Sequence, residues 1–117
     1  AAAAVEAFLA SQVADPETVG RGTRRRVEVS EPELDLAVHS LLEELVFLKD
    51  TERLLLHADS LRVWEAEGGW RIEAILAGEF LDPERHEMTV DIKAVTFHRL
   101  AAVRQGNRWT ATVVLDV

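Results

Sequence analysis

The chain has 117 residues, of which 48% are hydrophobic, and this predicts one domain with a buried core of its own. It contains no cysteine, which excludes disulfides, thiolate metal sites and cysteine nucleophiles and leads us to expect an intracellular, cytoplasmic protein. Its formal net charge of −8 would repel a phosphate backbone, so direct nucleic-acid binding is not expected. No apolar run reaches the length of a membrane span.

The first elements expected are a helix and a short strand. Residues 1–14 are rich in alanine and place Val5, Phe8, Leu9 and Val13 on one stripe of a helix. Neither a capping residue nor a methionine precedes this helix, so we expect the sequence to start partway into a longer natural protein. After a turn at residues 15–17, residues 23–29 are expected to form a strand.

A second, longer helix is the most strongly patterned element. Ser30 and Glu33 have the spacing of a capping box, with Ser30 as the N-cap. The apolar residues that follow recur at steps of three and four, so one broad face of this helix is predicted to be buried. These residues are Leu34, Ala37, Val38, Leu41, Leu45 and Leu48, with Leu42 and Val46 widening the face.

The remainder of the chain is expected to be mainly strands. The pattern predicts strands at residues 54–63, 70–76, 89–103 and 108–117, with turns at 67–70, 82–85 and 106–107. The resulting order favours an α+β fold: a two-layer sandwich with two helices packed on one face of a largely antiparallel sheet of five to six strands. Residues 91–98 are expected to form a central strand covered on both faces, because neither face of that strand is plainly polar.

One basic cluster stands out in this acidic chain. Arg21, Arg24, Arg25 and Arg26 lie beside two glycines at the start of the first predicted strand. A solvated charged loop and a phosphate-binding surface both fit this pattern.

Candidate chemistry gathers near the end of the chain. Asp116 and the terminal carboxylate of Val117 stand one residue apart, and hard oxygen ligands of this kind suit calcium or magnesium. A solvated chain end explains the same two carboxylates. Lys93 is expected on an otherwise apolar strand face. It is either an ion-pair partner of Glu79 or Asp91, or a functional cation.

Two further positions are candidates on weaker grounds. His98 is either a structural histidine at a strand end or part of a site, and His86 is expected to be structural. Glu79 follows Gly78, where a glycine permits a bulge or a close backbone approach, so its carboxylate points toward the site or lies on the surface.

Several of these segments carry a family resemblance. Residues 42–52, 78–86 and 91–98, followed by the closing Leu115-Asp116-Val117, resemble the archease family in order and spacing. The resemblance implies a divalent-metal site at Asp116 and Val117, with calcium expected and magnesium or zinc as alternatives. It also makes Lys93, His98 and Glu79 partner-facing or site-supporting residues. A first strand with a His-Thr-Ala-Asp type motif has no match here, and Leu41 and Glu43 replace an expected tryptophan and asparagine.

The function implied by this resemblance is that of an accessory protein rather than an enzyme. Archeases activate an RtcB-type tRNA ligase by promoting its GTP-dependent guanylylation and multiple turnover, so this ligase is the expected partner. A chaperone or modulator of RNA-modifying enzymes such as tRNA methyltransferases is the alternative. A small hydrolase using Lys93, His98 and Asp116 is a third reading, although the chain has no Gly-x-Ser-x-Gly elbow.

Overall fold

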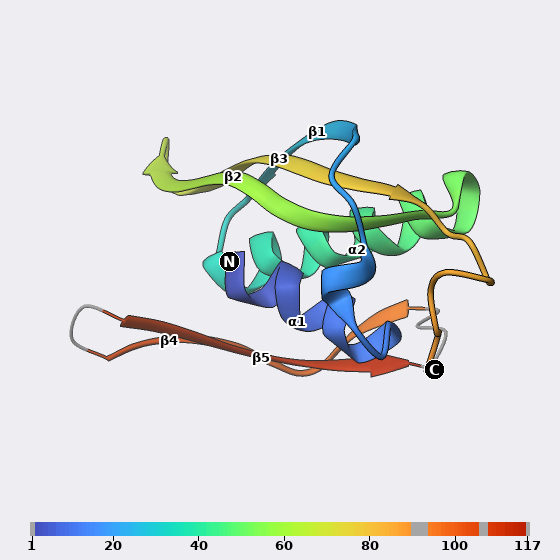
Figure 1. Ribbon diagram of the computed structural model, residues 1–117. Coiled ribbons are helices and arrows are strands. Elements are labelled where there is room, and N and C mark those ends of the chain that lie inside the picture. Colours follow the sequence, from blue (N-terminus) through green and yellow to red (C-terminus); the bar gives the residue numbers. More distant parts are fainter. Residues whose placement is uncertain (1, 90–93, 106–107, 117) are drawn as a thin grey trace.

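The computed structural model describes residues 2–89, 94–105 and 108–116, with side chains described for residues 4–89 (Figure 1). The elements follow in the order α1 (Ala2–Gln12), the short 3-10 helix η1 (Pro16–Thr18), β1 (Thr23–Glu31), α2 (Leu34–Glu52), β2 (Leu54–Ala66), β3 (Gly69–Phe80), β4 (Ala94–Gln105) and β5 (Arg108–Asp116). Both predicted helices and the strands expected before residue 80 are therefore present. The turn expected at residues 106–107 lies outside the described residues.

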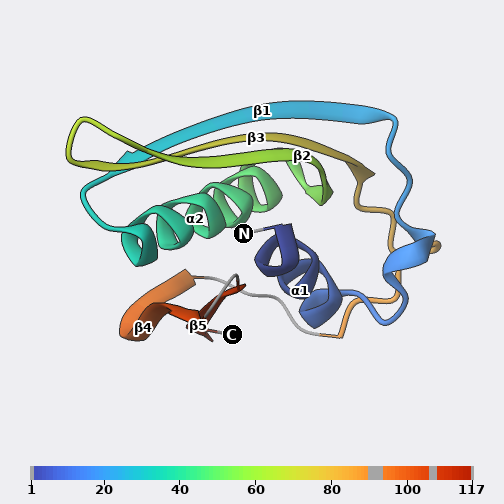
Figure 2. The same cartoon turned by 90° about the vertical axis from the view of Figure 1, so that its left-hand side faces the viewer.

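The described strands form two antiparallel sheets. One has three strands in the order β1-β3-β2, and the other is the pair β4-β5. Figure 2 shows α1 and α2 lying between these two sheets. The α+β class is confirmed, whereas a single sheet of five to six strands is not found in the described part of the chain.

The structure also differs from the expectation for residues 91–98. Within the described residues β4 pairs with β5 alone, so the expectation of a central strand is wrong for the portion from Ala94 onward. Strand β3 ends at Phe80, and the chain turns after Asp82. Before β4 begins, Met88 forms an isolated β-bridge with Val13, which follows α1. This path carries the chain away from the edge of the first sheet and past the helices.

Helix α2 is the centre of the main core. Its predicted apolar face is buried, with Leu41 and Ala37 fully inaccessible, and it packs against the inner face of the three-stranded sheet. Val5 and Phe8 of α1 join the same core. Burial of this wide apolar stripe contributes hydrophobic stabilisation to the fold.

The predicted capping box is wrong. Ser30 stays in β1, where it pairs with Arg71, and the helix begins after Glu33, which makes no side-chain capping hydrogen bond. The β1–β3 ladder continues to Glu31, and Pro32 favours an extended conformation for the residue before it. Strand pairing therefore outweighs the local capping preference of Ser30.

Hydrogen bonds that involve side chains connect α1 and the segment before β1 to β2. The ring of buried His57 in β2 has Nδ1 2.9 Å from the Glu6 carboxylate of α1 and Nε2 3.1 Å from the Val19 carbonyl oxygen. The other oxygen of Glu6 accepts the Ala58 N–H at the β-bulge of β2. These contacts fix α1 and the α1–β1 connection to β2.

The basic cluster is neutralised by neighbouring carboxylates. Arg21 and Arg24 both pair with Asp59, Arg25 pairs with Glu52, and Arg26 pairs with Glu28 and Glu73, so these ion pairs join β1 to elements beside it. Side chains engaged in this way offer less charge to a phosphate than the sequence alone suggests.

Candidate functional site

Asp116 lies at the end of β5, directly across the ladder from Ala94. The register continues through Val95 opposite Leu115, so the end of the chain is brought to the start of β4. Ala94 is the residue after Lys93; Lys93 itself and Val117 lie outside the described residues. The backbone pairing thus places Asp116 beside the start of β4.

His98 lies further along β4, in a break of the ladder. Thr96 is opposite Val114 and Ala101 is opposite Thr112, so His98 falls in the unpaired stretch between them. His98 is four positions beyond Ala94, a distance of roughly 13 Å along an extended strand. Its part in the site stays a prediction.

Glu79, at the end of β3, holds a cluster of hydrogen bonds. Its carboxylate accepts from the Arg85 guanidinium, from the Gly20 N–H and from His86 Nε2, which is 2.6 Å away. Burial raises the pKa of Glu79, but the hydrogen bonds from Gly20, His86 and Arg85 outweigh it and bring the pKa to about 2. Glu79 is therefore an ionised anchor between β3, the α1–β1 connection and residues 82–86.

His86 is oriented by two partners. Its Nδ1 accepts the Asp82 N–H at 2.9 Å, so the ring proton lies on Nε2 and is donated to Glu79. The ring is fully buried, as expected for a structural histidine. Because His86 also lines the cavity described next, Glu79 supports that cavity wall through the histidine.

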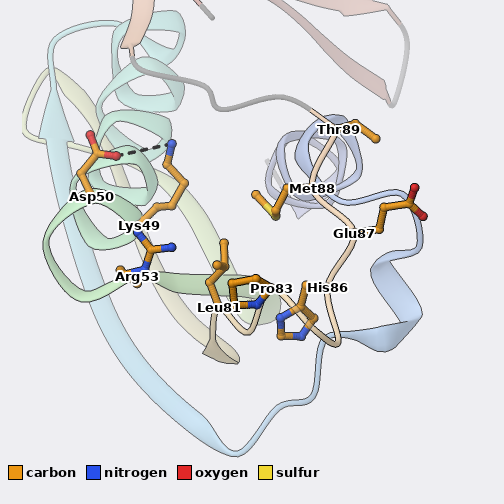
Figure 3. Close-up of a pocket in the computed structure, with 9 residues that line it drawn as sticks. All are labelled: Lys49, Asp50, Arg53, Leu81, Pro83, His86, Glu87, Met88 and Thr89. Atoms are coloured by element: carbon orange, nitrogen blue, oxygen red, sulfur yellow. Dashed lines mark ion pairs between the residues drawn. The ribbon is translucent and has the colours of Figure 1, made fainter.

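A cavity of about 660 Å³ opens beside this cluster (Figure 3). Lys49, Asp50 and Arg53 at the end of α2 form one wall. The segment after β3 forms the rest, through Leu81, Pro83, His86, Glu87, Met88 and Thr89. The sequence did not predict this cavity, because its two walls come from separate segments of the chain.

The described side chains include no cluster of metal donors. Among residues 4–89, whose side chains are described, no three histidine, aspartate or glutamate side chains gather as a metal site. Of the two ligands expected from the sequence, Asp116 ends β5 and Val117 lies outside the described residues; carboxylate oxygens are the donors that calcium and magnesium prefer. In the described part of the chain no helix is both long and apolar enough to cross a membrane.

Relatives with the same architecture are known. A solved structure, the solution structure of Methanobacterium thermoautotrophicum Protein 1598, superposes with a TM-score of 0.80 at 28% identity and covers 97% of this chain and 79% of that one. Its agreement over nearly the whole chain supports the α+β arrangement of helices and sheets.

Sequence comparison gives the family. "Protein archease" of Thermococcus gammatolerans is 40% identical over 95 residues, and that of Thermococcus kodakarensis is 37% identical over 94. Each match covers 80% of this chain and 66% of the relative, so the chain spans just under two thirds of their length. The model of the archease protein family matches residues 1–117. The resemblance expected from the motifs is thereby confirmed, and the chain belongs to the archease protein family.

Proposed function

We propose that this archease is an accessory protein of an RtcB-type tRNA ligase. In this role it promotes the GTP-dependent guanylylation of the ligase and its multiple turnover, and it performs no reaction alone. Family membership supports the proposal, and the structural observation that carries it is the pairing of Asp116 with Ala94. That pairing brings Asp116 beside Ala94, the residue that follows Lys93 in the sequence.

Asp116 and the terminal carboxylate of Val117 would hold the divalent cation, with calcium expected. A bound cation would supply positive charge that attracts and orients phosphate oxygens. Lys93, which precedes Ala94 in the sequence, adds a positive charge to the proposed site, and His98 is the more distant partner-facing residue. Glu79 acts indirectly, by holding His86 and Arg85 in place.

The charge of the chain suits a protein partner better than RNA. A net charge of −8 favours approach to a basic, RNA-binding ligase surface and speeds the encounter at low ionic strength. The pairing of Arg21, Arg24, Arg25 and Arg26 with carboxylates agrees with this direction of binding. The ligase rather than the nucleic acid is then the surface recognised.

The test adds the full-length protein to its cognate ligase with GTP and follows covalent guanylylation, with and without a chelator. We expect stimulation that the chelator removes. Lys93→Ala is expected to fold normally and lose the stimulation, while Arg71→Ala, on the distant part of β3, keeps it. Loss of folding in Lys93→Ala would make the lysine structural.

The other readings give different results in the same experiment. A chaperone of RNA-modifying enzymes such as tRNA methyltransferases suppresses aggregation with no metal requirement, and a hydrolase turns over substrate without the ligase. No stimulation of the ligase under any metal condition would contradict the proposal.

A further inference from the structure

Arg53 occupies a backbone conformation that favours glycine. It ends α2 in the left-handed region, with φ 56° and ψ 39°, and its N–H donates to the Leu48 and Lys49 carbonyl oxygens. Glycine is the commonest residue at such helix ends, because any other side chain is strained in this region. Backbone stability alone therefore favours glycine at position 53, and the arginine side chain calls for another explanation.

The guanidinium of Arg53 is also unusual among the arginines whose side chains are described. The others contact a carboxylate or, in one case, the ring of Trp64; they are Arg21, Arg24, Arg25, Arg26, Arg62, Arg71 and Arg85. The side chain of Arg53 makes no ion pair, hydrogen bond or ring contact with any residue in this part of the structure. Arg53 is also exposed, so in a chain with 21 acidic and 13 basic residues its guanidinium is accessible to a group from a partner.

The cavity beside Arg53 has two different walls. Figure 3 shows Lys49 and Arg53 on the α2 side, facing Leu81, Pro83 and Met88 of the opposite segment. The carboxylate of Glu87 points away from α2 in the same view. A volume of about 660 Å³ is much larger than a single ion needs and suits a short segment with a charged and an apolar side chain.

We propose that this cavity is a docking pocket for an acidic side chain of the ligase, and the inference rests on the proposed function. Arg53 pairs with the carboxylate in a bidentate manner, while an apolar neighbour from the same ligase segment packs on Leu81, Pro83 and Met88. In Figure 1 the end of α2, the segment 81–89 and the end of β5 lie on the same side of the molecule. The elements that line the pocket and the end of β5 therefore lie on the side that we assign to the partner.

A tethered carboxylate fits better than a free anion. The net charge of −8 repels small anions that approach from solution, whereas a side chain of a docked partner is delivered by the rest of the interface. A local positive charge within an acidic surface fixes the orientation and register of the docked partner.

The experiment measures the affinity of the full-length protein for its cognate ligase by titration, alongside the thermal midpoint of each variant. Arg53→Gln is expected to bind about tenfold more weakly, as for loss of one charge-assisted contact. Arg53→Lys is expected to lose less. The matched control is Arg71→Gln, an arginine at the far end of β3 whose pair with Glu67 is exposed, and it is expected to bind like the wild type.

Arg53→Gly separates a binding role from a structural one. It relieves the left-handed strain, so its thermal midpoint is expected to equal or exceed that of the wild type while affinity falls as in Arg53→Gln. A lowered midpoint with unchanged affinity would show a structural role and overturn the proposal.

The remaining outcomes are distinguishable from failure of the proposed function. Normal stimulation of the ligase by the wild type with undiminished binding by Arg53→Gln overturns the pocket alone. No binding by the wild type overturns both. A separate titration adds millimolar inorganic phosphate to the protein without ligase and follows the NMR signals of Arg53 and residues 81–89. Shifts of these signals would identify a free oxyanion as the occupant and overturn the choice of a carboxylate on the partner.

Discussion

Gly78 of β3 approaches Leu55 of β2 so closely that a β-carbon at position 78 would lie 1.7 Å from the Leu55 carbonyl oxygen. The glycine before Glu79 thus permits a close backbone approach, one of the two expectations raised by the sequence. The bulge lies elsewhere, between Ala58 and Ser60 of β2. This contact seats Glu79 beside Gly20 and the 82–86 turn.

Gly78→Ala is therefore expected to be strongly destabilising. The two strands must separate to admit the methyl group, which costs about 2 kcal/mol or more. Urea denaturation measures this, with Gly22→Ala as the control because nothing lies within 4 Å of a β-carbon there. The control is expected to stay within about 0.5 kcal/mol of the wild type. Equal stabilities for the two variants would contradict the described strand contact.

Glu79→Gln is expected to lower stability at neutral pH. The folded pKa of about 2 lies below the ordinary value of 4.5, so the ionised carboxylate stabilises the fold above pH 4.5 and this contribution is lost as the pH falls toward 2. We expect a loss of about 1 kcal/mol at pH 7, discounted because solvent reaches the carboxylate and screens its pairs.

Denaturation of Glu79→Gln and wild type at pH 7, 5 and 3 checks this sign. The difference between them is expected to persist at pH 5 and shrink at pH 3. Glu44→Gln, at an exposed position of α2, serves as the control and is expected to show little difference throughout. A gap that widens as the pH falls would contradict the role given to Glu79.

The buried and exposed faces of α2 provide a third prediction. Leu41 is 0% exposed and Phe47 is 58% exposed. Leu41→Ala is expected to destabilise the fold by about 2–5 kcal/mol, since it leaves a cavity, whereas Phe47→Ala is expected to change stability by less than about 1 kcal/mol. Comparable losses in thermal or urea unfolding would mean that α2 is rotated from the orientation described.

Local patterns predicted the helices and the early strands well because each depends on neighbours in sequence. The steps of three and four from Ala37 to Leu48 mark one helix face whatever packs on it. The start of α2 was predicted wrongly because Ser30 is held in the strand by Arg71, a residue 41 positions away. The division of the strands into two sheets depends on long-range pairing, which periodicity does not encode.

The candidate site shows the same limit. Strand patterns placed Asp116 and Lys93 at strand ends, but only the register reveals that Asp116 pairs with Ala94. The cavity at Arg53 joins α2 to residues 81–89, which have no regular pattern, so no local signal united them. His86 was expected to be structural, and its buried ring between Asp82 and Glu79 agrees with that expectation.

The most direct test of the account is guanylylation of the cognate ligase by full-length Asp116→Asn with GTP and calcium. Because this change removes one carboxylate charge from the proposed ion site and leaves the strand pairing intact, we predict normal folding and loss of the metal-dependent stimulation. Glu44→Gln, which also removes one negative charge, is predicted to stimulate like the wild type. Full stimulation by a folded Asp116→Asn would contradict the acidic, ion-holding site at the end of β5.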